Sequence, residues 1–349
     1  MAADRIRIGI VGAGANTRLR HLPGFRAIPG VEAVGVANRT PASTARVAQE
    51  FGIPKQFADW RSLVESKDID AVMIGTWPNL HCEVTLAALA AGKHVLTEAR
   101  MARDLTEARK MLAAAKAHPK LVTQVVPSPF GLQCGAAVKR LLDSHYLGSL
   151  REVVVIGADD QFWDYSKPLH WRQNPEISGK NVLTLGILHE TVSRWVPSVE
   201  QVFAQSTVFE ALRPVPEEAR NVEVTIPDSV HIVARLEGGA RSIYHMSGVA
   251  LFGPGKQIHL YGSRGTIRVH FGDRERVMIG HSGESAMHEA EIPKELESRW
   301  RVEEEFVNAI RGVEPVKLND FETGVRYMEF TEAVARSAEK NAPVSLPLA

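Results

Sequence analysis

A glycine-rich segment near the start of the chain has the composition of a loop that can hold a phosphate group. Gly9-Ile10-Val11-Gly12-Ala13-Gly14 continues an apolar run that begins at Ile6. Because glycine has no Cβ, the main chain at Gly12 and Gly14 can approach a pyrophosphate, and the helix expected to follow adds free N–H groups and partial positive charge. The G-x-G-x-x-G pattern would place its third glycine at position 17, where this chain has Thr17. The segment therefore predicts a dinucleotide site through an incomplete match.

The residues that end the second expected strand bear on the type of dinucleotide. An enzyme that uses NAD usually carries Asp or Glu there, and this carboxylate accepts a hydrogen bond from the adenosine 2′-hydroxyl. Here the residues are Ala37, Asn38, Arg39 and Thr40. With no carboxylate to repel a 2′-phosphate and with Arg39 available to bind it, NADP is favoured over NAD. The alternative is that Arg39 stacks on the adenine, which would suit either cofactor.

Length, charge and cysteine content limit the class of protein. The chain has 349 residues, enough for about two domains, and its 41 Lys and Arg balance 41 Asp and Glu. Balanced charge argues against a nucleic-acid or membrane-surface binder, and no apolar run approaches the ~20 residues of a membrane helix. Asp4 and Arg5 lie where a leader peptide would be apolar, so we expect a cytoplasmic protein. Cys82 and Cys134 are too few for a disulfide framework or a cysteine zinc site, and we expect no metal centre.

The first third of the chain alternates short apolar runs with helical patterns, the order that produces a parallel sheet covered by helices. Asp104 and Glu107 form a capping-box pattern for a helix that continues to about Lys116. Residues 1–126 therefore predict a doubly wound, dinucleotide-binding Rossmann domain. Its expected strands are Ile6–Val11, Val31–Ala37, Ala71–Thr76, His94–Thr97 and Leu121–Val125.

The pattern changes at the Pro127-Ser128-Pro129 break. Strands that follow one another without intervening helices predict an open, largely antiparallel sheet. We therefore expect residues 127–349 to form an α+β domain for substrate binding and oligomerisation, with the last helix packing back toward the first domain. Asn319 and Glu322 are the expected capping pair of that helix. The expected helices are 133–144, 181–195, 302–310 and 320–337, and the expected strands are 151–156, 201–209, 221–226, 230–236, 240–246, 257–261 and 266–271.

An ordered set of short motifs, spread from residue 9 to the late 320s, resembles the glucose-fructose oxidoreductase, inositol dehydrogenase and MocA family. Any one of these motifs is common, but the set in this order is specific. They are Gly12-Ala13-Gly14 with His21-Leu22-Pro23, Asn38-Arg39-Thr40, Asp70-Ala71-Val72 with Thr76-Trp77-Pro78-Asn79-Leu80-His81, Ala91-Gly92-Lys93-His94-Val95, His170-Trp171-Arg172, Leu260-Tyr261-Gly262-Ser263-Arg264-Gly265-Thr266 and the run from Phe321 to Tyr327.

The resemblance implies a Rossmann domain followed by an α+β domain whose open sheet often forms an oligomer interface, as a dimer or tetramer. It also implies a nicotinamide cofactor and a small sugar or polyol as substrate. The residues that it implies along the cofactor are Pro78, Asn79, His81, Glu98, Trp171 and Arg172, and we assign Asn16, Thr76 and Gln124 to the same site.

The chain departs from the family at the catalytic positions. Oxidation of a hydroxyl needs a group nearby that exchanges a proton. The family commonly supplies a Lys from Glu-Lys-Pro, with an Asp and a His four residues apart on a helix of the second domain. This chain has Glu98-Ala99-Arg100, and aligning Gly186 with the family's glycine puts Thr184 and Leu188 at the other two positions. None of the usual titrating groups is therefore present.

Four residues are weighed as substitutes. His189 is the strongest candidate base, since imidazole exchanges protons near neutral pH, with help from Glu190 or His170. Arg100 stays protonated and would polarise a carbonyl or bind a carboxylate. The competing interpretations are that His189 is a hydrogen-bonded structural histidine or a substrate contact. On the loop before His170, Trp163 and Tyr165 suit the C–H faces of a polyol, or an interface between subunits.

These observations predict an NAD(P)-dependent oxidoreductase that acts on a sugar, inositol or related polyol. Two alternatives stay open. Transient oxidation at one carbon would allow elimination of a glycosidic group and return of the hydride, as in some glycosidases related to this family. Loss of three family residues also suits a nucleotide-binding regulatory or scaffold protein without catalysis.

Overall fold

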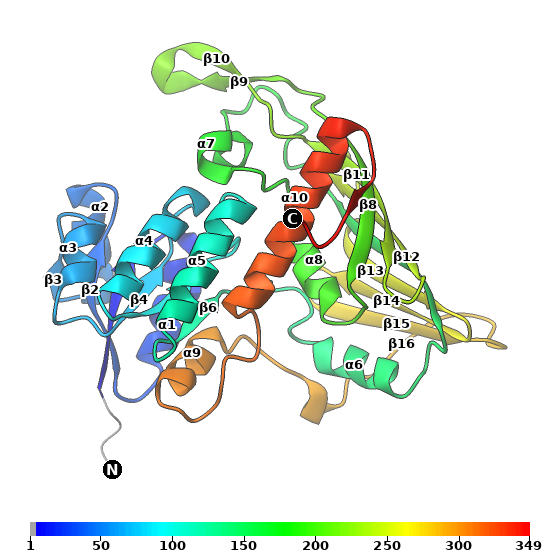
Figure 1. Ribbon diagram of the computed structural model, residues 1–349, viewed down its shortest axis with the longest axis horizontal. Coiled ribbons are helices and arrows are strands. Elements are labelled where there is room, and N and C mark those ends of the chain that lie inside the picture. Colours follow the sequence, from blue (N-terminus) through cyan, green and yellow to red (C-terminus); the bar gives the residue numbers. More distant parts are fainter. Residues whose placement is uncertain (1–4) are drawn as a thin grey trace. The chain divides into compact units, whose positions relative to one another are not determined.

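The computed structural model describes residues 5–349, and the chain groups into two compact units (Figure 1). Asp4, used above against a leader peptide, lies outside the described residues. The first unit comprises the chain up to Pro127 together with Arg301–Met328, and the second comprises Ser128–Trp300 together with Glu329–Ala349. The division expected from sequence placed everything after residue 126 in the second domain. The structure instead returns a C-terminal segment to the first unit.

The first unit is built on a parallel sheet. In the described part of the chain its six strands are ordered β3-β2-β1-β4-β5-β6. This order reverses direction beside β1, the place where doubly wound sheets bind dinucleotides. The strands are β1 (Ile6–Val11), β2 (Val31–Ala37), β3 (Lys55–Gln56), β4 (Ala71–Ile74), β5 (His94–Thr97) and β6 (Thr123–Val125).

Helices cover this sheet. Asp104 accepts a hydrogen bond from Glu107 N at 2.9 Å and so begins α5, as its sequence pattern predicts. The helical segments after β1 to β5 are a π-helical turn (Thr17–His21), α1 (Leu22–Arg26), α2 (Pro41–Phe51), α3 (Trp60–Glu65), α4 (Pro78–Ala90) and α5 (Leu105–Ala117).

The returning segment packs onto the same sheet, which explains why it belongs to the first unit. Val302, Phe306 and Val307 of α9 (Val302–Ile310) are buried, and Val125 N of β6 donates to Asn319 O at 2.9 Å. The expected capping pair of the last helix, α10 (Phe321–Lys340), is wrong. Asn319 has a left-handed φ of 62° and donates to Val126 O, whereas Asp320 accepts from Thr323 N at 2.8 Å.

The second unit contains a large mixed sheet. Within the described residues its nine strands are ordered β16-β15-β14-β13-β7-β12-β11-β8-β17, with β7 and β12 parallel and the other pairs antiparallel. The strands are β7 (Leu150–Ala158), β8 (Val199–Thr207), β11 (Ser229–Leu236), β12 (Arg241–Ser247), β13 (Gly255–Gly262), β14 (Gly265–Phe271), β15 (Glu275–His281), β16 (His288–Glu289) and β17 (Val344–Ser345). The sheet is therefore largely antiparallel, as expected.

One face of this sheet is covered and the other is open. Val230, Ile232 and Ala234 of β11 are buried, whereas the alternating Val233 is 52% exposed, like Ile243 beside it on β12. Helix α8 (Leu185–Ser193) packs against β7 on the covered side, where a Cβ at Gly157 would lie 2.7 Å from Leu188 Cδ1. The expectation that the open face joins subunits stays a prediction.

Two expected elements differ from the structure. The helix expected from residue 181 begins only at Leu185, because Leu183 has a left-handed φ of 47° and Asn181 donates to Ser178 O in a local turn. The strand expected at 221–226 is β10 (Arg220–Glu223), which pairs with β9 (Leu212–Val215) in a two-stranded hairpin outside the large sheet (Figure 1).

The remaining helical segments of this unit are short: α6 (Gly135–Asp143), α7 (Pro175–Ser178) and the 3-10 turns Trp171–Gln173, Pro216–Glu218 and Lys294–Leu296. Along residues 5–349, no helix combines the length and the apolar character that crossing a membrane requires.

Candidate functional site

The glycine loop lies against the loop that follows β4. Gly12 has a left-handed φ of 80°, and a Cβ there would lie 2.6 Å from Thr76 Cγ2 and 2.9 Å from Thr76 N. A Cβ at Gly75 would lie 2.3 Å from Gly12 O. Contacts this short do not occur between a real Cβ and main chain, so both positions need glycine. The two loops cross with main chain against main chain, and Gly14 remains exposed at the start of the helix.

Thr17 explains the incomplete glycine pattern. Its side chain is buried, its Oγ1 donates to Gly12 O at 3.3 Å, and a Cβ at Gly75 would lie 2.0 Å from that same Oγ1. The third glycine of the pattern serves close packing between helix and strand. Here the glycine is on the other side of the contact: Gly75 has no Cβ, and this leaves room for the Thr17 side chain. The substitution therefore keeps the loop geometry.

Asn38 holds the glycine loop from the end of β2. Its Oδ1 accepts from Ala13 N at 2.7 Å, and its Nδ2 donates to Ser43 O at 3.1 Å. Thr40 caps α2, because its Oγ1 accepts from Ser43 N. Asn38 and Thr40 were expected at the adenosine end of the cofactor. In the structure these polar atoms form hydrogen bonds within the chain. Arg39 is exposed, with its guanidinium 5.6 Å from the centre of the Trp77 ring.

A buried ionic cluster lies beyond the loop, on the β4–β5 side of the sheet. His21 donates from Nε2 to Glu98 Oε1 at 3.0 Å and from Nδ1 to Glu303, and Asn16 also donates to Glu98. Burial opposes a charge on His21, but the two carboxylates outweigh it and raise the pKa of the imidazole to about 9. Burial would likewise raise the pKa of Glu98, yet the hydrogen bond from His21 holds it below its ordinary value. Asn16 and Glu98 were both expected at the cofactor. In the structure both belong to the hydrogen-bonded cluster around His21.

The motif that begins α4 contributes one residue with an unused polar atom. Asn79 Oδ1 is buried and has no hydrogen-bond partner among the described residues. His81 is fully buried, with Nδ1 2.9 Å from Arg100 O and Nε2 3.0 Å from Thr76 O, so it ties two loops together. Burial also lowers the pKa of His81. His81 and the buried Pro78 shape the loop at Thr76 and expose little or no surface to a ligand.

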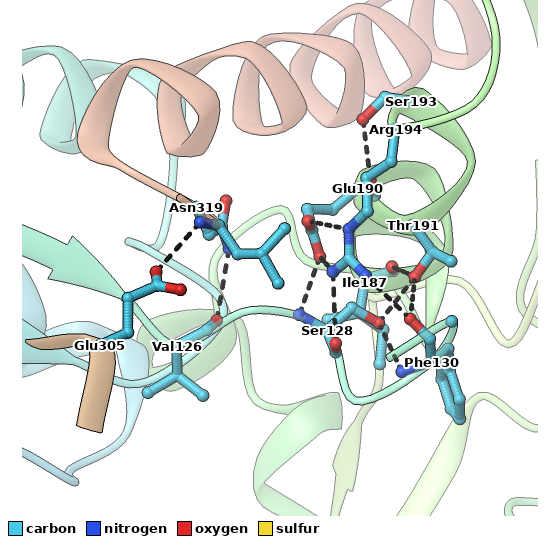
Figure 2. Close-up of polar contacts among 12 residues, drawn as sticks. Val126, Ser128, Phe130, Ile187, Glu190, Thr191, Ser193, Arg194, Glu305 and Asn319 are labelled. Carbon is cyan, nitrogen blue, oxygen red and sulfur yellow. Dashed lines mark hydrogen bonds and ion pairs between the residues drawn. The ribbon is translucent and has the colours of Figure 1, made fainter. Parts of the chain in front are cut away.

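Two further predictions for this unit are wrong in their placement. Gln124 is 0% exposed and donates to Glu305 Oε1 at 3.1 Å, which also accepts from Leu318 N. Figure 2 shows Glu305 beside the Asn319 segment. A side chain with no exposed surface cannot contact a bound cofactor, so Gln124 belongs to the core. Arg100 is also buried, and its peptide bond with Ala99 is cis. It therefore offers little surface for the substrate role proposed from sequence.

His189 in the second unit is a core residue. Its ring stacks on Phe330 with centroids 3.5 Å apart, and its Nδ1 lies 2.9 Å from Tyr244 Oη. Burial lowers the pKa of His189 to about 3, so the imidazole is neutral at physiological pH. The structure turns this side chain inward, between Tyr244 and Phe330. The interpretation of a hydrogen-bonded structural histidine fits, and a role as general base does not.

The carboxylate of Glu190 is also held by hydrogen bonds within the protein (Figure 2). Its carboxylate accepts from Arg194 at 2.9 and 2.7 Å and from Ser128 N at 2.8 Å, while Arg194 also donates to Phe130 O at 3.1 Å. Thr191 Oγ1 donates to Ser128 Oγ at 2.8 Å. These bonds fasten the segment after Pro127 to α8. Glu190 therefore supports the fold rather than assisting a base.

The loop between β7 and α7 carries the remaining expected residues. Trp163 and Tyr165 are exposed, whereas His170 and Arg172 are half-buried. His170 Nδ1 accepts from Arg172 N at 3.2 Å, and burial together with Arg172 lowers the pKa of His170. The guanidinium of Arg172 lies 4.2 Å from the centre of the Trp171 ring, and burial lowers the pKa of Arg172. Of the four proposed catalytic residues, only His170 keeps an accessible titratable side chain.

Sequence reasoning missed two residues of the buried ionic cluster. His21 was noted only as part of a motif, and Glu303 was not considered. A histidine seven residues after the second glycine signals nothing by itself, because its partners Glu98 and Glu303 are 77 and 282 residues away. Only the three-dimensional structure brings these charges together.

The first unit fits a dinucleotide. Gly12 turns with a positive φ between β1 and the first helix, the exposed Gly14 lies at the start of that helix, and Asn79 Oδ1 is a buried acceptor without a partner in the described chain. Gly12, Gly14, Arg39 and Asn79 are the residues whose surfaces would hold the cofactor from pyrophosphate to either end.

The close contact at Gly12 predicts that a substitution there weakens cofactor binding. Gly12→Ala should weaken binding of a nicotinamide dinucleotide at least about tenfold, because the left-handed φ and the Thr76 main chain both reject a Cβ. Titration of cofactor fluorescence measures this. Gly52→Ala is the matched control, since Gly52 also has a positive φ of 61° but open space around it. Equal affinity in wild type and Gly12→Ala would show that the loop does not hold the cofactor.

The buried imidazolium makes the stability of the first unit depend on pH. Folded His21 keeps its proton up to about pH 9, whereas the unfolded chain loses it near 6.5, so stability present below pH 6.5 is lost as the pH rises through 9. The free energy of unfolding should fall by about 3 kcal/mol over this range. Urea unfolding at several pH values measures it, with His21→Gln expected to flatten the profile. A flat profile in the wild type would contradict the bridging role.

Comparisons with known proteins agree with the fold. The model of the oxidoreductase family with an NAD-binding Rossmann fold, GFO_IDH_MocA, matches residues 6–125, and the GFO/IDH/MocA C-terminal domain matches residues 136–268. Levoglucosan dehydrogenase of Pseudarthrobacter phenanthrenivorans is 25% identical over 316 residues, 81% of this chain and 78% of that protein. Myo-inositol 2-dehydrogenase of Thermotoga maritima is 23% identical over 264 residues, 75% and 74% of the two chains.

Solved structures show the same architecture. Levoglucosan dehydrogenase in complex with NADH and L-sorbose superimposes with a TM-score of 0.89 at 22% identity, over 99% of this chain and 100% of that one. The expected fold class, a Rossmann domain followed by an α+β domain, is confirmed. The two family models together span both units, and the chain belongs to the Gfo/Idh/MocA family of oxidoreductases.

Proposed function

We propose that this protein transfers a hydride between a nicotinamide dinucleotide and a hydroxyl-bearing carbon of a sugar or polyol. The observation that carries the proposal is the glycine loop after β1, which packs against Thr76 at Gly12 and leads to the exposed Gly14, where the first helix begins. The relatives named above oxidise levoglucosan and myo-inositol by their names, and the exposed Trp163 and Tyr165 suit such ligands.

We further propose NADP(H) as the preferred cofactor. The end of β2 offers no carboxylate between residues 37 and 41, and Asn38 is turned inward to Ala13 N. Arg39 is the exposed cation of that segment, and a guanidinium binds a phosphate through charge-assisted hydrogen bonds. The alternative is that Arg39, whose guanidinium lies 5.6 Å from the centre of the Trp77 ring, stacks on the adenine, which would serve either cofactor.

The residues of this chain have defined tasks in that reaction. Gly12 and Gly14 admit the pyrophosphate, and the helix start adds N–H donors. We assign the nicotinamide half to the side of β4 and β5, where Glu98 follows the last residue of β5. A bound nicotinamide supplies the hydride acceptor or donor. The hydroxyl proton leaves to water when the substrate is oxidised and returns from water when it is reduced.

His170 is the proposed contact of the substrate oxygen. Because its Nδ1 accepts from Arg172 N, the neutral ring carries its proton on Nε2 and donates there. A neutral imidazole that donates to an oxygen stabilises the negative charge that develops on it, without acting as a base. The lowered pKa of His170 keeps this form dominant at neutral pH.

A non-catalytic nucleotide-binding protein is the second candidate. It is favoured by the burial of His189, Glu190 and Arg100, which removes three of the four groups proposed for chemistry. That role requires cofactor binding without turnover of any polyol, so a single assay separates the two candidates.

The cofactor preference is tested by Arg39→Ala. Affinity for NADPH should fall about tenfold to hundredfold while affinity for NADH stays unchanged, because only the 2′-phosphate loses its charge partner. Calorimetric titration with both cofactors measures the change. Arg46→Ala, an exposed arginine of α2, is the matched control. Equal loss for both cofactors would assign Arg39 to the adenine instead.

The reaction is tested by cofactor reduction with levoglucosan, myo-inositol and related polyols. We expect turnover with at least one, constant above about pH 6.5 and falling in acid, where a proton on His170 Nδ1 breaks the hydrogen bond from Arg172 N that orients the ring. His170→Ala should lower kcat/KM about a hundredfold, and His231→Ala on the open sheet face should leave it unchanged.

Three outcomes would contradict parts of this proposal. Full activity in His170→Ala removes His170 from the reaction. Cofactor binding without turnover points to the non-catalytic role. Cleavage of a glycoside with unconsumed cofactor identifies transient oxidation followed by elimination.

A further inference from the structure

The loop that carries Trp163 presents its indole on a firmly held main chain. Trp163 is 49% exposed, yet the residues around it are bonded to their neighbours. Trp163 N donates to Asp160 O at 3.3 Å, and Lys167 N donates to Asp164 O at 3.2 Å. Asp164 Oδ1 accepts from Ser166 N at 3.0 Å. An exposed aromatic side chain on an ordered turn keeps a fixed position at little cost in entropy when a ligand binds.

Arg213 of β9 is buried beneath this turn and forms hydrogen bonds with its main chain. Its side chain is 1% exposed, and its two terminal nitrogens donate to the carbonyl oxygens of Phe162 and Asp164. These two carbonyls flank Trp163 on either side. The planar fork of one guanidinium therefore fixes the main chain before and after the indole.

The burial of this cation is costly, which indicates that its geometry matters. Its Nε is buried without a hydrogen-bond partner in the described chain, and its two bonds go to neutral main chain. A buried charge held only by carbonyls stabilises a fold less than an apolar side chain of similar volume would. Asp164 lies near enough for Arg213 to contribute to lowering the pKa of that carboxyl, after the larger effect of Ser166. A contact that serves packing alone would not need a guanidinium.

The hairpin of β9 and β10 contacts the loop that carries Trp163. It stands outside the nine-stranded sheet and meets the Trp163 loop twice, through Arg213 and through Leu169 N, which donates to Pro214 O at 2.9 Å. The other side of the loop is held by Phe162 N, which donates to Gly248 O at 2.6 Å. Two neighbouring residues of β9 thus fasten the half of the loop that leads to His170.

We propose that Arg213 is a positioning residue for the sugar, acting through Trp163: the β9–β10 hairpin holds the indole where it stacks on the C–H face of the substrate. This inference rests on the proposed polyol oxidoreductase activity. Arg213 itself touches neither sugar nor cofactor. Its effect is confined to the binding of the sugar.

The test is a double-mutant cycle on sugar turnover. Arg213→Lys keeps the charge but supplies one nitrogen in place of a fork, so it should raise KM for the polyol about tenfold while kcat and the affinity for NADPH stay within about twofold. Trp163→Ala should raise KM by a similar factor. Adding Arg213→Lys to Trp163→Ala should then change KM by less than about twofold, because both act through one contact.

Hydrogen exchange gives a second readout that does not depend on activity. In Arg213→Lys the amides of residues 160–167 should exchange about tenfold faster, with β7 and β12 unchanged. Arg220→Lys is the matched control, since Arg220 lies on β10 of the same hairpin and pairs at the surface with Glu218. Unchanged exchange in the loop would overturn the positioning role whether or not a substrate is known.

The remaining outcomes separate this inference from the proposed function. Turnover in the wild type with an unchanged KM in Arg213→Lys, or with independent effects of the two substitutions, overturns the inference and leaves the function standing. Absence of turnover with every polyol overturns the function, and the inference falls with it.

Discussion

The nucleotide half of this protein depends on one steric constraint: two loops cross so closely that neither tolerates a Cβ at the crossing. Gly12 turns with a positive φ against the main chain of Thr76, and Gly75 lies against Gly12 O. Everything that the first unit offers to a diphosphate follows from this approach. Asn38 stabilises it by accepting from Ala13 N, and Thr17 uses the space that Gly75 leaves. The loop geometry is thus preserved although one glycine of the usual pattern is absent.

Titratable groups in both units are largely committed to holding the fold. His21 bridges Glu98 and Glu303, Glu190 pairs with Arg194, and His189 stacks in the core. Buried polar groups must find partners because an unsatisfied one costs free energy. Three of the four side chains proposed for catalysis from the sequence, His189, Glu190 and Arg100, are therefore buried. The proposed chemistry falls to the half-exposed His170.

The sequence predicted the architecture well because periodicity and capping are local. The five strands expected in the first sheet, the Asp104 cap of α5 and the helix 302–310 agree with the structure within a few residues, whereas the two-residue strand β3 was not predicted. The sequence did not predict which polar side chains are buried or which residues they contact far along the chain. Helical spacing showed that His189 and Glu190 lie on α8 but not which neighbours they meet, and Gln124 was assigned to the cofactor although β6 buries it against Glu305. The predicted cap of α10 was wrong because Asn319 instead accepts a hydrogen bond from Val125 N of β6 and donates one to Val126 O.

The claim on which the others rest is that the crossing of the glycine and Thr76 loops grips a pyridine dinucleotide. Isothermal titration of the full chain with NADPH, NADP, NADH and NAD tests it directly. One saturable binding event per chain, tightest for a phosphorylated cofactor, is the predicted result. No heat of binding with any of the four, in a protein that melts cooperatively, would contradict it.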